Sequence, residues 1–329
     1  MSKPRLAIIG SGNIAEFHVP ACKKAGFEIS AITASPGSKK VHQFSHRHKI
    51  PLIYDSADLL LNASVEWDAL LICSSIDSTL DILKKAIEVG APILVEKPIS
   101  KRSMDLVPLL KYKGPLIVGY NRRFYRPVQS ARQFVENSPP LMATLELPES
   151  IRTPNHLGED PDYLMRFFSN SVHGLDLARY VLGHLSVNNV HHLTNNWGGI
   201  ISILATMSTD NGSILQFHGN WSTPCNSRLT LDQQGSRFEI KPFEAASVYE
   251  GMKVLEPTDE FPVRRYVPKQ MSTVTLEDVD QKLKPGFFAQ AKTLANLLKG
   301  VSPGPAATLE DAYEVLLLAE ELVGQPSQH

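Results

Sequence analysis

Short apolar runs of strand length recur through the first 125 residues, and segments of helical period lie between several of them. The runs are Leu6–Ile9, Ile29–Thr33, Ala69–Cys73, Ile93–Val95 and Leu116–Val118. The segments Phe17–Lys24 and Ser78–Val89 show the helical period, and Gly90 is a stop signal for the second of them. Strands that alternate with helices in this way are typical of a parallel sheet with crossover helices.

The pattern changes after Arg126-Pro127, where consecutive strand-like runs replace the alternation. Helical patterns are predicted over Val128–Glu136 and His173–Leu182. The strand-like runs are Met142–Leu147, Val187–Leu193, Gly199–Thr209, Ser213–Asn220, Ser227–Gln233 and Arg237–Ile240. Turn signals such as Asp210-Asn211-Gly212 separate neighbouring runs, so an open, mainly antiparallel sheet is expected.

The last part of the chain returns to helix at Phe287–Lys299 and Leu309–Leu322. The polar stretch Met252–Lys284 is interpreted as an irregular edge of the second domain. A length of 329 residues fits two domains. We predict an α/β chain with one domain over residues 1–124 and a second over residues 125–329.

Composition and charge exclude several classes of protein. The chain has 33 Lys and Arg against 34 Asp and Glu, so its net charge is −1. It therefore lacks the excess of positive charge that general binding to nucleic acids or to anionic membranes requires. No run of about 18 apolar residues is present, so no membrane span is expected. Cys22, Cys73 and Cys225 are too far apart for a zinc motif, and His191-His192 has no partner at ligand spacing, so no metal is assigned. Sparse cysteines and a short N-terminal apolar run predict a soluble cytoplasmic protein.

A glycine motif follows the first predicted strand. Gly10-Ser11-Gly12-Asn13-Ile14-Ala15 reads GxGxxA and opens a helix. In such a motif the first glycine allows a tight turn, the second lets a pyrophosphate approach the backbone, and a small third residue lets the helix pack on the strand. The helix N-terminus adds N–H groups for the phosphates. A tight turn without a ligand is the alternative, but the recurring strands favour a dinucleotide site.

The end of the second predicted strand bears on the choice of cofactor. An acidic residue there would accept a hydrogen bond from the ribose 2′-hydroxyl of NAD. The segment after Thr33 instead contains Ser35, Ser38, Lys39 and Lys40, which suit a 2′-phosphate. We therefore expect NADP, with NAD as the alternative. The two lysines could also simply begin a solvated helix.

Three further motifs occur in order behind the glycine motif. The fourth strand runs into Glu96-Lys97-Pro98, which puts a lysine where open α/β sheets bind ligands. Gly119-Tyr120-Asn121-Arg122-Arg123-Phe124 and His173-Gly174-Leu175-Asp176 follow, the second of these on a predicted helix start. Together with Glu16-Phe17-His18, these motifs make the chain resemble the Gfo/Idh/MocA family of oxidoreductases over nearly its whole length.

The resemblance implies a Rossmann domain, a second domain with an open antiparallel sheet, and self-association through that sheet as a dimer or tetramer. It implies hydride transfer between nicotinamide C4 and a carbinol carbon of a sugar, sugar nucleotide or cyclitol. Lys97 and His173 match the family's catalytic positions, and the Lys97-Pro98 bond is expected to be cis. His18 is interpreted as helix packing or an indirect contact.

The site residues expected from the motifs and the resemblance form two sets. For the cofactor they are Gly10, Gly12, Asn13, Ile14, Ser35, Lys39, Cys73, Ser74, Ser75, Glu96, Lys97, Asn121 and Arg122. For the substrate they are Lys97, Tyr120, Arg123, Arg152, Arg166, Asn170 and His173. Where the family often has an aspartate four residues before the histidine, this chain has Ser169. That departure removes one carboxylate contact and leaves more of the mechanism to Lys97 and His173.

Three alternatives stay open. The chain could act on a non-sugar such as a dihydrodiol, it could be a catalytically silent cofactor-sensing regulator, or it could recycle a bound nicotinamide between two sugars. A sensor needs the glycine motif but has no need of Lys97 and His173 together, so the pair favours an enzyme.

Overall fold

The computed structural model describes residues 3–136, 138–149, 163–194, 196, 200–221 and 223–324. The chain divides into two compact units. Unit 1 contains Met1–Phe124 and Glu277–Glu320, and unit 2 contains Tyr125–Leu276 and a short segment after Glu320. Each unit has its own sheet.

Unit 1 is built on a six-stranded sheet with the order β3-β2-β1-β4-β5-β6, and every pair of neighbours is parallel. Its strands are β1 (Arg5–Ile9), β2 (Glu28–Thr33), β3 (Leu52–Tyr54), β4 (Ala69–Ile72), β5 (Ile93–Val95) and β6 (Leu116–Val118). This is the doubly wound arrangement, in which the order reverses between β1 and β4. The predicted α/β class with a parallel Rossmann sheet is confirmed.

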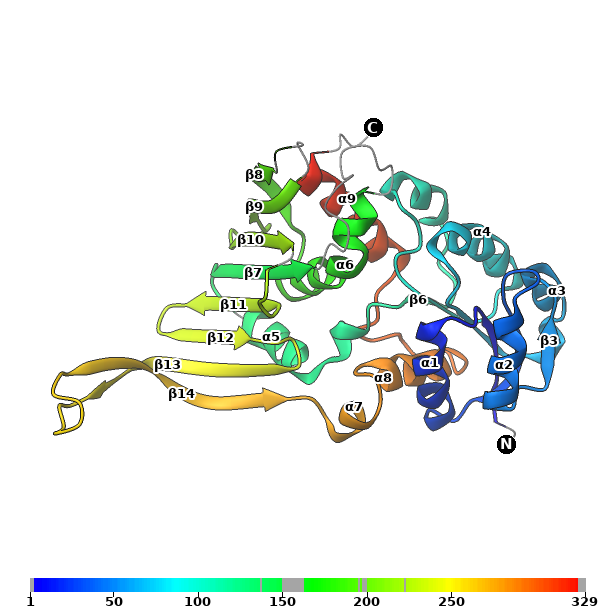
Figure 1. Cartoon of the computed structure of the whole chain (residues 1–329), viewed down its shortest axis with the longest axis horizontal. Coiled ribbons are helices and arrows are strands. Elements are labelled where there is room, and N and C mark those ends of the chain that lie inside the picture. Colours follow the sequence, from blue (N-terminus) through cyan, green and yellow to red (C-terminus); the bar gives the residue numbers. More distant parts are fainter. Residues whose placement is uncertain are drawn as a thin grey trace. The chain divides into compact units, whose positions relative to one another are not determined.

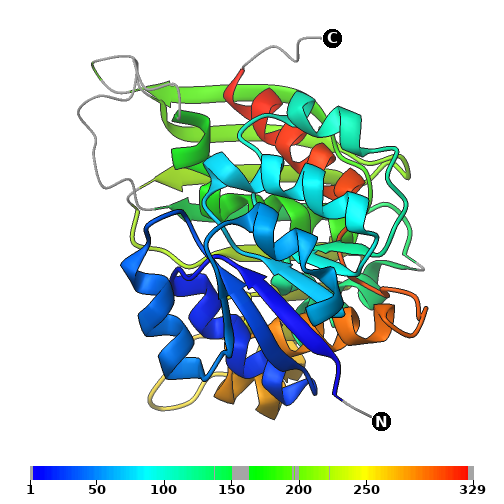
Figure 2. The same cartoon turned by 90° about the vertical axis from the view of Figure 1, so that its right-hand side faces the viewer.

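Helices lie on both sides of this sheet (Figure 2), and those that contact its strands are α1 (Asn13–Lys24), α2 (Lys39–His48), α3 (Ala57–Asn62), α4 (Ile76–Ala86) and α8 (Phe287–Leu297). Unit 1 also contains α7 (Asp278–Lys282) and most of α9 (Leu309–Val323), whose last three residues belong to unit 2. Short 3₁₀ turns are η1 (Ser64–Glu66), η2 (Ile87–Val89), η3 (Ser103–Leu109) and η4 (Asn121–Phe124). Because both faces are covered, the central strands are apolar on both sides, as in Leu6–Ile9.

The C-terminal segment of unit 1 corrects the predicted domain boundaries. Residues 277–320 pack with the first domain, whereas the sequence analysis assigned all of 125–329 to the second. Ala291 and Leu294 of α8 share one hydrophobic cluster with Leu6 and Ile8 of β1. The apolar face of α8 is thus buried against the parallel sheet, a contact that no local pattern could have revealed.

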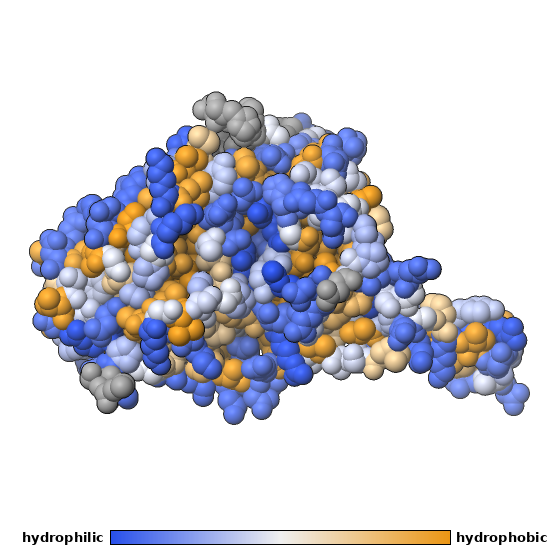
Figure 3. Space-filling model, turned by 180° about the vertical axis from the view of Figure 1, so that it is seen from behind, coloured by the Kyte–Doolittle hydropathy of each residue, from blue (hydrophilic) through white to orange (hydrophobic). Residues whose placement is uncertain are grey.

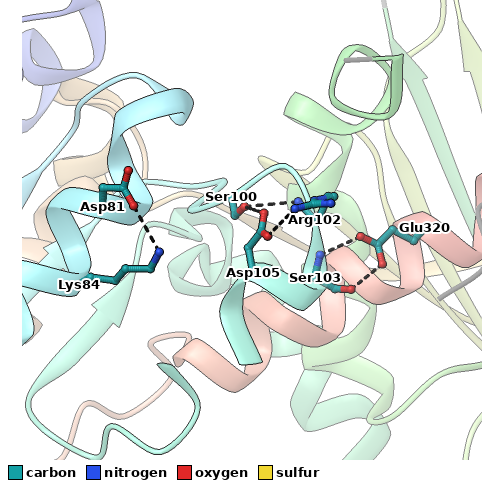
Figure 4. A network of polar contacts seen from close by, with 7 residues as sticks. All are labelled: Asp81, Lys84, Ser100, Arg102, Ser103, Asp105 and Glu320. Atoms are coloured by element: carbon teal, nitrogen blue, oxygen red, sulfur yellow. Dashed lines mark hydrogen bonds and ion pairs between the residues drawn. The ribbon is translucent and has the colours of Figure 1, made fainter. Parts of the chain in front are cut away.

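A buried polar contact fixes α9 within unit 1 (Figure 4). Ser103, the first residue of η3, donates its backbone N–H to Glu320 Oε1 at 2.8 Å and its hydroxyl to Glu320 Oε2 at 2.5 Å. Close by, Asp105 accepts hydrogen bonds from Ser100 and Arg102. Both oxygens of the buried Glu320 carboxylate therefore have partners, as a charge inside a protein requires.

Unit 2 is built on an eight-stranded sheet with the order β14-β13-β12-β11-β7-β10-β9-β8. The strands are β7 (Met142–Glu149), β8 (Ser186–Thr194), β9 (Ile200–Ser208), β10 (Ile214–Trp221), β11 (Arg228–Gln233), β12 (Ser236–Ile240), β13 (Ala245–Leu255) and β14 (Arg265–Thr275). The helices α5 (Arg126–Glu136) and α6 (Tyr163–Leu182) pack on one face (Figure 1). The sheet is mainly antiparallel as predicted, except that β10 runs parallel to β7.

The prediction of an irregular edge over Met252–Lys284 is wrong for most of that stretch. Residues 245–255 and 265–275 form the antiparallel pair β13 and β14, which extends beyond β12 (Figure 1). Its outer part carries exposed apolar side chains such as Met252 and Tyr266 among charged ones (Figure 3). Because both faces of this hairpin are exposed, the strands lack the alternation of buried and exposed positions on which the sequence analysis relied.

Candidate active site

The chain turns sharply where β1 ends. Gly10 has a φ of +116°, and its N–H donates to the carbonyl of Thr33 at 2.8 Å. A Cβ at Gly10 would lie 2.3 Å from the carbonyl oxygen of Cys73. The position therefore requires glycine both for its backbone conformation and for the close approach of the chain after β4. This contact brings the glycine turn and the Cys73–Ser74 segment together at the carboxyl edge of the sheet.

Gly12 is different, because a Cβ there would meet no atom within 4 Å. It is the N-cap of α1, and its side-chain position faces open space in front of the N–H groups that begin the helix. Ala15, one turn later, is fully buried against the sheet. The turn thus leaves room for an anion at the positive end of a helix, which fits the pyrophosphate of a dinucleotide.

A hollow of about 290 Å³ lies at the carboxyl end of β2. Ser35, Ser38 and Lys39, three of the residues predicted to bind the cofactor, line it. His42 and Asp55 line it as well, and the sequence analysis named neither. Asp55 was missed because it follows β3, a strand of three residues that pairs with β2 and that produced no clear pattern.

The segment after β4 holds Cys73, Ser74 and Ser75. Ser74 and Ser75 hydrogen-bond Thr79 and Ser78 at the start of α4, so their hydroxyls fix the beginning of that helix. Burial, with a further contribution from the charge of Glu96, raises the pKa of the Cys73 thiol well above its usual value. Burial also raises the pKa of Cys22 to about 12. Both groups are therefore thiols at neutral pH and poor nucleophiles.

The segment after β5 carries Glu96 and Lys97, and the Lys97-Pro98 bond is cis as expected. Glu96 Oε2 accepts the backbone N–H of Lys97 at 3.2 Å, and Oε1 lies 2.7 Å from His18 Nε2. Only a small part of Glu96 is exposed. Its carboxylate is thus directed to the protein interior, whereas the sequence analysis expected it to contact the cofactor. His18, interpreted there as a packing or indirect residue, contacts this motif directly.

The segment after β6 includes two predicted substrate residues that the structure buries. Tyr120 is 1% exposed, and Arg123 is 4% exposed. Arg123 forms an ion pair with Asp311 at 2.9 Å. Burial alone would raise the pKa of Asp311, but the charge and hydrogen bond of Arg123 and the hydrogen bonds from Thr308 together lower it. Arg123 thus pairs with an aspartate of unit 1, and the role of both side chains in substrate binding stays a prediction.

Asn121 and Arg122 stand in the same turn, η4. Asn121 donates its side-chain amide to the carbonyl of Pro285 at 2.8 Å, and a Cβ at Gly286 would lie 2.2 Å from the Asn121 carbonyl oxygen. This predicted cofactor residue therefore also joins the turn after β6 to the segment that leads into α8. Arg122 is half-buried.

In unit 2, His173 lies in the middle of α6 and not at a helix start. It is 8% exposed, and Asp176, one turn later, is fully buried. A Cβ at the neighbouring Gly174 would lie 2.3 Å from the side chain of Leu147 in β7. The glycine thus lets α6 pack closely on the sheet beside His173.

Of the other predicted substrate residues in unit 2, the structure describes the side chain of Asn170 only. Asn170 is exposed on α6. Arg152 lies outside the described residues, as do the side chains of Arg166 and Ser169.

The described part of the chain contains no group of three or more histidine, cysteine, aspartate or glutamate side chains placed to hold a metal ion. None of its helices combines the length and the apolar character that crossing a membrane would need.

Unit 1 is similar in sequence to a family of known proteins. Residues 4–118 match the model of the Gfo/Idh/MocA family, described as an oxidoreductase family with a NAD-binding Rossmann fold. An uncharacterised oxidoreductase, YrbE of Bacillus subtilis, is 30% identical over 188 residues, which are 54% of this chain and 53% of that protein. The myo-inositol 2-dehydrogenase of Thermotoga maritima is 25% identical over 190 residues, which are 54% and 55% of the two chains. The chain thus spans about half the length of the curated relatives it matches.

Solved structures extend the likeness of fold to both units. The crystal structure of an oxidoreductase from Thermotoga maritima matches with a TM-score of 0.76 over 98% of this chain and 96% of its own, at 19% identity. At that identity the likeness shows the fold alone. Residues 4–118 are thus similar to the NAD-binding Rossmann model of the Gfo/Idh/MocA family, and the solved structures share the fold of both units.

Proposed function

We propose that the protein is a nicotinamide-dependent dehydrogenase that acts on a secondary alcohol, or the corresponding ketone, of a sugar, sugar nucleotide or cyclitol. The observation that carries the proposal is the carboxyl edge of the unit 1 sheet, where the open Gly12 position follows β1 and the Glu96-Lys97-Pro98 segment follows β5, the two strands that flank β4. A relative named myo-inositol 2-dehydrogenase supports a polyol as the substrate class.

In the proposed mechanism, the bound nicotinamide supplies the hydride acceptor or donor at C4. Gly12 and the first N–H groups of α1 hold the pyrophosphate. Lys97 donates a hydrogen bond to the reacting oxygen and stabilises the negative charge that develops there. His173 accepts the hydroxyl proton during oxidation and returns it during reduction.

A panel assay tests this function. Purified protein would be mixed with NADP or NAD and with free sugars, nucleotide-linked hexoses and inositols, while the absorbance of the reduced nicotinamide is followed. We expect turnover of at least one polyol. A folded protein that binds the cofactor but oxidises and reduces nothing in the panel would contradict the proposal and favour a cofactor sensor.

We propose NADP as the preferred cofactor. Ser35, Ser38 and Lys39 line the hollow at the end of β2, and a 2′-phosphate would find two hydroxyls and a cation there. Asp55 lines the same hollow and opposes a phosphate by its charge. The preference therefore depends on the balance between Lys39 and Asp55 within one small space.

We expect NADP to bind more tightly than NAD. The difference in affinity should become smaller as the salt concentration rises, because salt screens the exposed charges. Lys39→Ala should lower the affinity for NADP and leave that for NAD nearly unchanged, and Asp55→Asn should raise the affinity for NADP. Calorimetric titration with both cofactors measures these effects. Lys40→Ala, at the neighbouring exposed lysine, serves as the control. Equal affinities at low salt, or a preference for NAD, would reverse the assignment.

We also propose self-association through the open face of the unit 2 sheet. On β9 and β10, Met207, Leu215 and Phe217 are buried on the side of α5 and α6, whereas Leu204 and Ile214 on the opposite face are 42% and 44% exposed. Covering such side chains with a second copy removes apolar surface from water. A dimer or a tetramer satisfies this requirement.

The assembly is expected to be visible by light scattering at micromolar protein. Leu204→Glu and Ile214→Glu should shift the wild-type oligomer toward monomer, because each puts a charge into the proposed contact. Val65→Glu is the matched control, because Val65 is 79% exposed in unit 1 and outside the sheet face. A monomeric wild type would contradict the proposal.

A further inference from the structure

A histidine and a glutamate form a buried pair beside Lys97. His18 Nε2 of α1 lies 2.7 Å from Glu96 Oε1, although 78 residues separate the two positions in the sequence. His18 is fully buried, and Glu96 is 8% exposed. The mechanism proposed above uses neither side chain, so the buried pair needs an explanation of its own.

The surroundings of His18 show which ring nitrogen bonds to Glu96. Its Nδ1 has no hydrogen-bond partner among the described residues. A carboxylate oxygen only accepts hydrogen bonds, so the Nε2–H of His18 donates to Glu96. The ring of Phe287, 4.3 Å away between centroids, packs against the imidazole and holds it in place.

The Glu96 carboxylate is constrained at its other oxygen as well. Oε2 accepts the backbone N–H of Lys97 at 3.2 Å. A Cβ at Gly119 would lie 2.9 Å from the same oxygen, so the chain after β6 closes the space around the carboxylate. A continuous path of hydrogen bonds thus leads from α1 through Glu96 to the peptide of Lys97.

We propose that His18 is a positioning residue for Lys97, and that it acts through the Glu96 carboxylate. This inference rests on the role of Lys97 in the proposed function. A group that stabilises charge in a transition state works only when its backbone is held in one place, because a displacement of about 1 Å can cost about 10²-fold in rate. His18 fixes the rotamer of Glu96, and Glu96 in turn holds the backbone of Lys97 in place.

The experiment compares His18→Leu, which removes the donor, with His18→Gln, which keeps an N–H able to reach Glu96. Ser103→Ala is the matched control, because it also removes a buried hydrogen bond to a glutamate of unit 1. Two quantities are measured in each variant: hydrogen exchange at the Lys97 amide, and turnover together with the affinity for the cofactor. The amide is a specific probe, since Pro98 has no N–H.

For His18→Leu we expect exchange at the Lys97 amide to quicken by about tenfold or more, because the acceptor of that N–H is no longer fixed. Turnover should fall by about tenfold to 10²-fold, while the cofactor dissociation constant stays within about twofold. His18→Gln should restore most of both. Ser103→Ala should lower the melting temperature without changing either quantity. If His18→Leu does not fold, Glu96→Gln keeps the volume, removes the charge and should also quicken the exchange.

Equal exchange at Lys97 in His18→Leu and Ser103→Ala would overturn the proposal, and so would a loss of turnover without faster exchange. Exchange needs no substrate, so it decides the positioning role even if the wild type turns over no polyol. In that case the proposed function fails, and the role of His18 in holding the Lys97 peptide is still judged separately.

Discussion

Replacing Lys97 or His173 by alanine is expected to lower turnover by about 10²–10⁴-fold, the usual cost of removing a positioned acid–base or charge-stabilising group. The affinity for the cofactor should change little, because neither side chain is proposed to hold the pyrophosphate. Stopped-flow or steady-state rates with a substrate from the panel assay measure the effect, and titration measures the cofactor affinity.

The double variant adds a stricter test. If both side chains act on the same reacting oxygen, removing the second costs far less than removing the first, and the effects are not additive. Lys101→Ala is the matched control, because Lys101 follows the same segment but forms an exposed ion pair with Asp77. Near-wild-type turnover in both single variants would contradict the assigned roles.

The second large effect is expected at the glycine turn, where Gly12→Val should weaken the binding of either nicotinamide cofactor by at least about tenfold, or roughly 1.4 kcal/mol. A Cβ at Gly12 meets no protein atom within 4 Å, so the fold tolerates the substitution. The valine side chain instead fills the space in front of α1 that the pyrophosphate needs. Calorimetry gives the affinity, and circular dichroism with a melting curve checks the fold.

Gly10→Ala separates this effect from a folding defect. It places a Cβ 2.3 Å from a backbone oxygen at a φ of +116°, so it should lower the melting temperature strongly. Gly12→Val should instead lose binding with the melting temperature of the free protein retained. If the Gly12→Val variant is folded and binds the cofactor as tightly as the wild type, the assignment of the dinucleotide site to this turn is wrong.

The fold of unit 1 was largely readable because its central strands are buried on both faces. Continuous runs such as Leu6–Ile9 and Ala69–Ile72 therefore appear as apolar segments in the sequence. β3 escaped notice because it is a three-residue edge strand with two exposed apolar side chains, Leu52 and Ile53. Helix α8 was predicted, but its packing against α1 depends on contacts that are remote in sequence.

The fold of unit 2 was harder to predict from the sequence, for physical reasons. The parallel pairing of β10 with β7 joins strands about 70 residues apart, and a local pattern carries no information on such a pairing. The start of α6 was placed ten residues too late, because the sequence Ser169-Asn170-Ser171 consists of residues that favour helix N-caps. In the structure these residues lie within the helix, and the helix begins at Tyr163.

The local arrangement of the candidate site was predictable where the backbone geometry follows from the residue type, as at Gly10 and at the cis Lys97-Pro98 bond. It was not predictable where burial decides the role. Arg123 forms an ion pair with Asp311, and Glu96 contacts His18. Neither contact could be predicted, because each partner comes from a distant segment of the sequence. The same holds for Asp55, whose place beside Lys39 follows from the pairing of β2 with β3.

Transfer of an isotopic label tests the central claim most directly. A polyol found in the panel assay, deuterated at the carbon that is oxidised, would be incubated with oxidised cofactor and the protein, and the cofactor would be analysed by mass spectrometry and NMR. The account predicts deuterium at nicotinamide C4, with transfer slowed by about 10²–10⁴-fold in Lys97→Ala. Deuterium that appears only in water, or transfer that is unaffected by Lys97→Ala, would contradict it.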